Sequence, residues 1–235
     1  MQVVIRSLLE GARAAEGVAV IIDVYRAMTT VAVLLAGGVR RLYLVADVEA
    51  ARRQRDSGRA DFCAGEVDGI PPAGFDFGNS PNEVSRADLA GRTVVLSTRA
   101  GTTGMEAAAR AVRRFAGAFV NAAATAAALR SLRPPLVTLV AMGWNAGERT
   151  DEDEECAAYL RDLLEGRAPD AVAVRRRVLA ARESQKFGDP ARPWFRREDR
   201  DLALDFDRYD FAVEVVPEDG LLVARKNAPP AEGRP

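Results

Sequence analysis

Polar and charged side chains gather in residues 23–30, where a strongly apolar run gives way to a predicted helix. Asp23 can ligate a metal ion or position water, and the fork of Arg26 can bind phosphate or sulfonate. Free backbone N–H groups at a helix start also favour an anion. The simpler interpretation is that Asp23 or Thr29 only caps the helix. The segment therefore predicts either an anion site or a capped helix start.

A second polar segment, residues 97–104, has the same place between an apolar run and a predicted helix. Glycines let the backbone approach an oxyanion, while hydroxyl groups and an arginine supply hydrogen-bond donors. The candidate residues are Ser97, Thr98, Arg99, Gly101 and Thr102. The segment lacks the lysine and the spacing of a Walker loop, so it does not predict a nucleoside triphosphate site. A turn with a helix cap is the alternative.

A long stretch rich in glycine and proline, residues 65–81, separates these two segments. Compact domains rarely keep so long an irregular loop without a use such as a ligand wall or a lid. Glu66 lies at a predicted strand end, where a carboxylate can ligate a metal ion, and Asn79 and Ser80 lie at the far end of the loop. The sequence Gly-Asn-Ser-Pro is also ordinary turn chemistry.

An acidic run, residues 148–155, follows the apolar segment 136–142. Acidic residues at a helix start offset the positive end of the helix dipole and need no further role. One or two of them could nonetheless complete a Mg²⁺ site with Asp23 and Glu66. The two cysteines, Cys63 and Cys156, are predicted to be reduced thiols, and neither is expected to be a nucleophile.

Composition narrows the chemistry. The chain of 235 residues has no histidine, which excludes a Ser-His-Asp relay, a phosphohistidine and a histidine-ligated metal. Carboxylates, arginines, hydroxyls and oxygen-ligated metals remain. Its 33 basic and 34 acidic residues nearly cancel, so no overall field attracts nucleic acid or a membrane. With no long apolar span and no secretory pattern, the protein is expected to be cytoplasmic.

Strand and helix patterns alternate along the chain, which predicts an α/β fold with three layers, α/β/α, and a largely parallel or mixed sheet. Strands are expected at 17–24, 41–46, 59–64, 92–97, 116–120 and 136–142, and helices at 27–35, 48–57, 103–113, 122–132, 152–164 and 171–183. Residues 186–200 give no clear pattern. A hairpin at 211–224 ends a single domain, 1–226, with two lobes, 1–90 and 91–226, as an option; 227–235 is expected to be a disordered tail.

Four segments, in order, resemble those of the 2-phosphosulfolactate phosphatase (ComB) family. Residues 23–30 are similar to its D-V-L-R-A-T-T-T segment, and 65–66 with 74–81 to its G-E…G-F-D-x-G-N-S-P stretch. Residues 97–102 resemble the hydroxyl-rich strand end before its G-T pair, and 152–157 its E-D-x-x-C-A helix start. The resemblance spans about residues 18 to 216. The chain departs from the family pattern at Tyr25, Met28, Arg99, Ala100 and Ala158.

The resemblance implies hydrolysis of the phosphate monoester (R)-2-phospho-3-sulfolactate with Mg²⁺, in the coenzyme M route. It implies Asp23, Glu66 and Asp153 as metal ligands, with Asp23, Arg26 and Arg99 in catalysis. The further expected catalytic residues are Asn79 and Ser80, and the expected substrate-binding residues are Thr29, Thr30, Ser97, Thr98, Gly101 and Thr102. The partner is then a small anionic phosphate ester, and a homo-oligomer is compatible with the sequence.

Two alternatives stay open at this point. The same machinery could act on another small phosphorylated acid, or the chain could be an anion-binding module that has lost turnover. Tyr25 stands where haloacid-dehalogenase phosphatases carry the second aspartate of D-x-D, which disfavours an aspartyl-phosphate route without excluding it.

Overall fold

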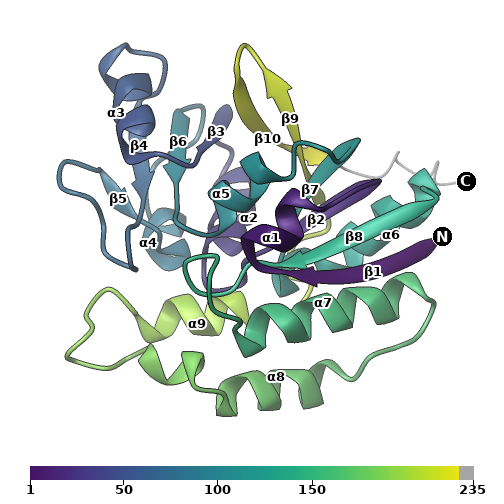
Figure 1. The fold of residues 1–235 in the computed structure, drawn as a ribbon. Helices are drawn as coiled ribbons and strands as arrows, with labels where there is room; N and C mark the ends of the chain where they lie inside the picture. The colour runs from purple at the N-terminus through teal and green to yellow at the C-terminus, as the bar shows by residue number, and fades with distance from the viewer. Residues whose placement is uncertain (228–235) are drawn as a thin grey trace, which may run out of the picture.

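The protein has one ten-stranded mixed sheet with helices on both faces, as the computed structural model in Figure 1 shows; it describes residues 1–227. The strand order is β1-β8-β2-β7-β9-β10-β3-β6-β4-β5. This arrangement confirms the predicted α/β class with a mixed sheet. The part of the predicted tail beyond Asn227 lies outside the described residues.

Two parallel blocks make up the sheet. The first contains β1 (Gln2–Ser7), β8 (Leu136–Ala141), β2 (Val18–Ile22) and β7 (Arg113–Gly117). The second contains β3 (Arg41–Val45), β6 (Thr93–Ser97), β4 (Phe62–Gly65) and β5 (Phe77–Gly78). Each block contains strands from both predicted lobes, 1–90 and 91–226, while the division into lobes stays a prediction.

An antiparallel hairpin, β9 (Ala212–Glu218) and β10 (Leu221–Asn227), joins the two blocks. The second block consequently runs opposite to the first within the sheet. At the usual twist of about 20 to 25° per strand pair, the six steps from β2 to β4 amount to roughly 120 to 150°. A turn of that size brings the carboxyl ends of the two blocks toward the same side of the molecule.

The helices bury apolar side chains against both faces of the sheet. One cluster involves α1 (Leu8–Arg13), α2 (Ala27–Ala36), α4 (Pro81–Ser85) and α5 (Gly101–Ala107). Another involves α6 (Ala122–Leu132), α7 (Asp151–Leu164) and α8 (Ala171–Ala180), and reaches Ala203 in α9 (Arg197–Ala203). The third lies beneath α3 (Val48–Asp56), whose first turn is capped by the Asp47 carboxylate. The fully buried strand β2 fits between helices on both faces, as its continuous apolar sequence requires.

Several boundaries differ from the sequence-based expectations. The helix expected at 103–113 ends at Ala107, and the next strand begins earlier, at Arg113. The strand β1 and the helix α1 were not predicted. Cys63 and Cys156 are buried and unpaired, as expected. Among residues 1–227, none of the helices has the length and apolar character needed to cross a bilayer.

Candidate active site

Two carboxylates from different blocks of the sheet face one small cavity. Asp23 follows β2 and Glu66 follows β4 directly, and both are buried. With Arg26 and Asn79 they line a space of about 20 Å³, which we call the inner cavity. That volume is sufficient for one water molecule or one ion. The twist of the sheet thus brings together groups that are distant in sequence.

Asp23 is fixed by the helix that begins after it. Its Oδ1 accepts a hydrogen bond from the Ala27 N–H at 3.0 Å. Its Oδ2 faces Gly101, where a Cβ would lie 2.9 Å from that oxygen and 2.6 Å from the Ala27 Cβ. Glycine is therefore required at 101 for the second loop to approach the first. Burial raises the pKa of Asp23 to about 6, the nearby Glu66 charge adds to the rise, and the Ala27 N–H opposes it.

Glu66 is held by two backbone donors. Its Oε2 accepts from the Gly69 N–H at 2.7 Å, and its Oε1 accepts from the Arg99 N–H at 2.9 Å. Each carboxylate oxygen has a further lone pair. These two hydrogen bonds therefore orient the carboxylate and leave each oxygen able to ligate a cation. Asn79 also lines the inner cavity, and its Oδ1 is buried and has no hydrogen-bond partner. An unpartnered buried oxygen is costly unless a donor or a cation is supplied to it.

Arg26 reaches the inner cavity but is also tightly bound to the protein. Its guanidinium donates to Asp199 Oδ2 at 3.0 Å, to the Gly69 carbonyl at 3.2 Å and to the Trp194 carbonyl. It also lies over the Phe195 ring, 5.0 Å from its centroid. Asp199 is fully buried, and its second oxygen accepts from Ser80 Oγ at 2.6 Å and from the Asn82 N–H at 3.0 Å. One carboxylate thus ties Arg26 to the Gly-Asn-Ser-Pro turn.

The second polar loop turns its side chains inward, onto its own backbone. The Thr98 N–H donates to Thr102 Oγ1 at 2.8 Å, and the Thr102 N–H donates to Thr98 Oγ1 at 3.1 Å. Both side chains are buried, and Arg99 is exposed to solvent. Of this loop only Ala100 lines the inner cavity. Its polar groups therefore build the turn and support Glu66 through the Arg99 backbone.

Asp153 joins the ends of two strands. Its Oδ1 accepts from the Val24 N–H at 2.7 Å, and its Oδ2 accepts from the Gly143 N–H at 2.8 Å. It is buried and does not line the inner cavity. Within residues 1–227, no three acidic or cysteine side chains are grouped closely enough to hold a metal ion. The expected trio of Asp23, Glu66 and Asp153 is therefore not assembled, because Asp153 does not line the inner cavity that Asp23 and Glu66 share.

A family model for 2-phosphosulpholactate phosphatase matches residues 4–191, which is more than half of the chain. The chain belongs to the 2-phosphosulfolactate phosphatase family.

Curated relatives of the family support this membership. A probable 2-phosphosulfolactate phosphatase of Thermus thermophilus is 36% identical over 148 residues, covering 63% of this chain and 61% of the relative. One of Synechocystis is 32% identical over 165 residues, covering 69% and 68%. One of Bacillus subtilis is 28% identical over 209 residues, covering 86% and 87%. The aligned region thus spans less than two thirds of the Thermus relative and most of the Bacillus one.

The structure brings four of the predicted site residues to the inner cavity: Asp23, Arg26, Glu66 and Asn79. Ser80 lies one residue beyond, where its Oγ binds Asp199 and accepts the Glu83 N–H at 3.2 Å as the cap of α4. The remaining predicted groups do not line the inner cavity. They are Thr29, Thr30, Ser97, Thr98, Arg99, Gly101, Thr102 and Asp153. Strand-end position alone therefore does not distinguish the predicted residues that line the inner cavity from those that do not.

Two buried acids were missed by the sequence analysis. Asp199 lies in α9, after a stretch without a clear pattern, and only its burial beside Arg26 identifies it. Glu152 was passed over in favour of its neighbour Asp153. Its Oε2 is buried without a partner, and burial, with a smaller effect of Glu183, raises its pKa to about 8. Burial therefore favours the protonated form of Glu152.

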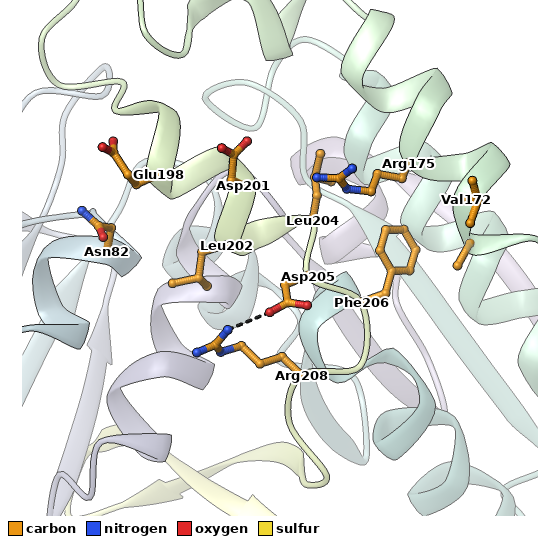
Figure 2. Close-up of a pocket in the computed structure, with 11 residues that line it drawn as sticks. Asn82, Val172, Arg175, Glu198, Asp201, Leu202, Leu204, Asp205, Phe206 and Arg208 are labelled. Carbon is orange, nitrogen blue, oxygen red and sulfur yellow. Dashed lines mark hydrogen bonds and ion pairs between the residues drawn. The ribbon is translucent and has the colours of Figure 1, made fainter.

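A larger groove of about 650 Å³ lies away from these groups, between α8, α9 and residues 204–208. Figure 2 shows its lining, where Asp205 and Arg208 are paired at 2.7 Å. Apart from Asn82, which binds Asp199 through its backbone, no residue of the inner cavity's network contributes to the groove. The charged side chains of the groove, those of Arg175, Glu198, Asp201, Asp205 and Arg208, are all exposed, whereas Asp23 and Glu66 are buried. The inner cavity is therefore the better candidate for chemistry.

Proposed function

We propose that the chain hydrolyses a small acidic phosphate monoester of the 2-phospho-3-sulfolactate type, using Mg²⁺ held by Asp23, Glu66 and Asn79. The observation that carries the proposal is the convergence of these three oxygen-bearing side chains on the inner cavity beside Arg26. The names of the curated relatives agree with this reaction class.

The donor set suits a hard cation. Mg²⁺ takes carboxylate and amide oxygens and keeps several waters or substrate oxygens as its other ligands. Asp23 and Glu66 supply two carboxylates of like charge, and Asn79 supplies the oxygen that is otherwise without a partner. A bound cation would relieve the repulsion between the carboxylates and satisfy the orphaned oxygen. When present, Mg²⁺ would neutralise charge on the phosphoryl group and lower the pKa of a bound water.

The side chains of this chain would supply the rest of the chemistry. Arg26 offers fixed positive charge to the phosphoryl oxygens, and Asp199 holds its orientation. Asp23, with its pKa near 6, is ionised at neutral pH and can accept a proton from an attacking water. The products are then the hydroxy acid and inorganic phosphate.

The substrate needs more room than the inner cavity provides. A space of about 20 Å³ does not admit a phosphate ester. Phe195 covers Arg26, and the carbonyl of Trp194 occupies one of its donors. We infer that the connection between α8 and α9, which carries both aromatic residues, shifts when the substrate binds. This movement would free a guanidinium donor for a phosphoryl oxygen.

A phosphate-release assay tests the proposal. The purified protein, supplied with Mg²⁺, should hydrolyse 2-phospho-3-sulfolactate, and EDTA should abolish the reaction. A panel that includes 2-phospholactate and phosphoglycolate separates the sulfonated substrate from other phosphorylated acids. Equal turnover of sulfonated and plain phospholactates would contradict the specific substrate. Absence of phosphate release from every ester on the panel would support the alternative of an anion-binding module without turnover.

A further inference from the structure

A second, larger space adjoins the inner cavity. It measures about 310 Å³, and we call it the outer chamber. The two spaces share Trp144 and Phe195, so these rings form the wall between them. Cavities that bind small organic molecules begin at about 300 Å³. The outer chamber therefore has room for a portion of a ligand that extends beyond the phosphate site.

The outer chamber contains both tryptophans of the chain, Trp144 and Trp194. Trp144 is already occupied, with the Lys186 Nζ 3.9 Å from its ring centroid and Phe195 on another side at 6.1 Å. Trp194 is different. Its side chain is 43% exposed, and the described residues give its ring no aromatic or cationic neighbour. A large unpartnered ring at the mouth of a cavity is a surface on which a planar group can stack.

Trp194 also connects the outer chamber to the phosphate site. Its backbone carbonyl accepts a hydrogen bond from Arg26, while its side chain lines the outer chamber. Pro193 precedes it, and Ile70, which is 49% exposed, lies on the same wall. A three-carbon sulfonated acid offers polar oxygens and almost no apolar surface. Binding of such an acid would therefore not use the apolar surface that Trp194, Pro193 and Ile70 provide.

The polar groups of the outer chamber favour an anion over a cation. Lys186 and Arg192 line it, against one carboxylate, that of Asp68. Asp68 is engaged by the Asn145 amide at 2.7 Å. Lys186 is paired with Glu183, whereas the nearest carboxylate to Arg192, that of Asp189, lies 3.6 Å away. The side chain of Arg192 is 51% exposed, so its charge is available at the chamber wall.

We propose that Trp194 and Arg192, on the displaced α8–α9 connection that walls the outer chamber, bind an aromatic, acidic portion of a phosphate monoester whose phosphate lies in the opened inner cavity. The ring stacks on Trp194, and the acidic group is directed to Arg192. This inference rests on the proposed phosphatase function for the position of the phosphate. It extends that function to substrates larger than a three-carbon acid.

Binding can be measured without turnover. The probe is 4-carboxybenzyl phosphonate, which cannot be hydrolysed, and phosphonoacetate is the matched aliphatic acid. Because both tryptophans line the outer chamber, intrinsic fluorescence reports its occupancy directly. Titration with Mg²⁺ present should give saturable quenching by the aromatic probe, with about tenfold tighter binding than phosphonoacetate shows by calorimetry.

Variants assign the interaction to Trp194. Trp194→Ala should weaken binding of the aromatic probe about tenfold, and Trp194→Phe should recover most of the affinity because it keeps a ring. Ile70→Ala, on the same wall, should weaken it by a smaller factor, and Arg192→Gln should reduce the preference for the carboxylated probe over benzyl phosphonate. Val112→Ala is the surface control, because Val112 is 83% exposed and does not line the chamber.

The results separate the two proposals. If the aromatic probe binds no more tightly than phosphonoacetate, or if Trp194→Ala does not weaken it, the assignment of the outer chamber is wrong. Absence of phosphate release from every ester would instead overturn the phosphatase proposal while leaving the fluorescence result intact. With turnover present, the ratio of kcat/KM for 4-carboxybenzyl phosphate to that for phosphoglycolate should fall about tenfold in Trp194→Ala. The two esters differ in intrinsic reactivity, but this difference is the same for wild type and variant. It therefore cancels when the ratio is compared between the two proteins.

Discussion

The loops after β2 and after β6 have similar sequences of polar residues but different structural roles. Both follow a buried strand, both precede a helix and both carry hydroxyls and an arginine. In the first loop, Asp23 and Arg26 face the inner cavity. In the second, Thr98 and Thr102 bind each other's backbone, and Arg99 points to solvent. The first loop thus directs charged side chains at the inner cavity, whereas the second uses its hydroxyl groups to hold its own turn.

The largest expected contrast is in catalysis. Asp23→Asn should lower kcat/KM for phosphate release about 10³-fold, because it removes a metal ligand and the base. Ser97→Ala, at the corresponding strand end of the second loop, should change kcat/KM by less than about threefold, since Ser97 does not line the inner cavity. The check is a steady-state assay of both variants with saturating Mg²⁺. Comparable losses in the two variants would mean that both loops take part in the reaction.

The two arginines give the next contrast. Arg26→Gln should lower kcat/KM about 10²-fold through loss of fixed charge at the phosphoryl group, whereas Arg99→Gln should change it by about twofold or less. Arg26 is paired with the buried Asp199, so thermal unfolding of the variant must be compared with that of the wild type. A well-folded Arg99→Gln protein with the larger loss would reverse the roles assigned to the two loops.

Stability should move in opposite directions in the two loops. The pKa of Asp23 rises from 3.8 to about 6 on folding, so its ionised form costs stability above that pH. Asp23→Asn should therefore stabilise the metal-free protein by about 2 kcal/mol at pH 7.5 and by little below pH 4. Thr102→Val removes buried hydrogen bonds and should destabilise by about 1 to 3 kcal/mol. Denaturant unfolding in EDTA measures both.

The pH dependence is a smaller effect of the same carboxylate. Because Asp23 must be ionised to bind a cation, Mg²⁺ affinity should fall as pH drops through about 6, and kcat/KM measured at subsaturating Mg²⁺ should fall with it. The expected loss is about tenfold per pH unit. Thr102→Ser, which alters no titrating group, should keep the same midpoint. A midpoint near pH 4 in both proteins would show that burial does not raise the pKa of Asp23.

Local patterns predicted the elements that are locally determined. The fully apolar β2, the helix α6 at Ala122–Leu132 and the Asp47 cap of α3 follow from sequence that needs no distant partner. The position of the β9–β10 hairpin could not be obtained this way. The hairpin itself was predicted and is present, but its pairing between β7 and β3 in the middle of the sheet was not predicted. Pairing of that kind depends on contacts between segments far apart in the chain.

The same limit applies to the site. Strand-end position identified Asp23, Glu66 and the Asn79 turn, which do meet. The family resemblance added Asp153, because nothing in an acidic helix start tells which carboxylate will be taken by the Val24 and Gly143 amides. Asp199 and Phe195 were not identified, because they come from a stretch without periodicity. Their importance follows from the fold, which places both against Arg26.

The central claim is that Asp23, Glu66 and Asn79 form one cation site, and calorimetric titration with Mg²⁺ tests it most directly. Wild-type protein should bind one ion per chain, and Glu66→Gln should weaken that binding at least tenfold. Asp68→Asn is the matched control, because it removes a carboxylate two residues away and asparagine tolerates the left-handed backbone found there. It should keep wild-type affinity. Equal Mg²⁺ affinity in wild type and Glu66→Gln would contradict the account.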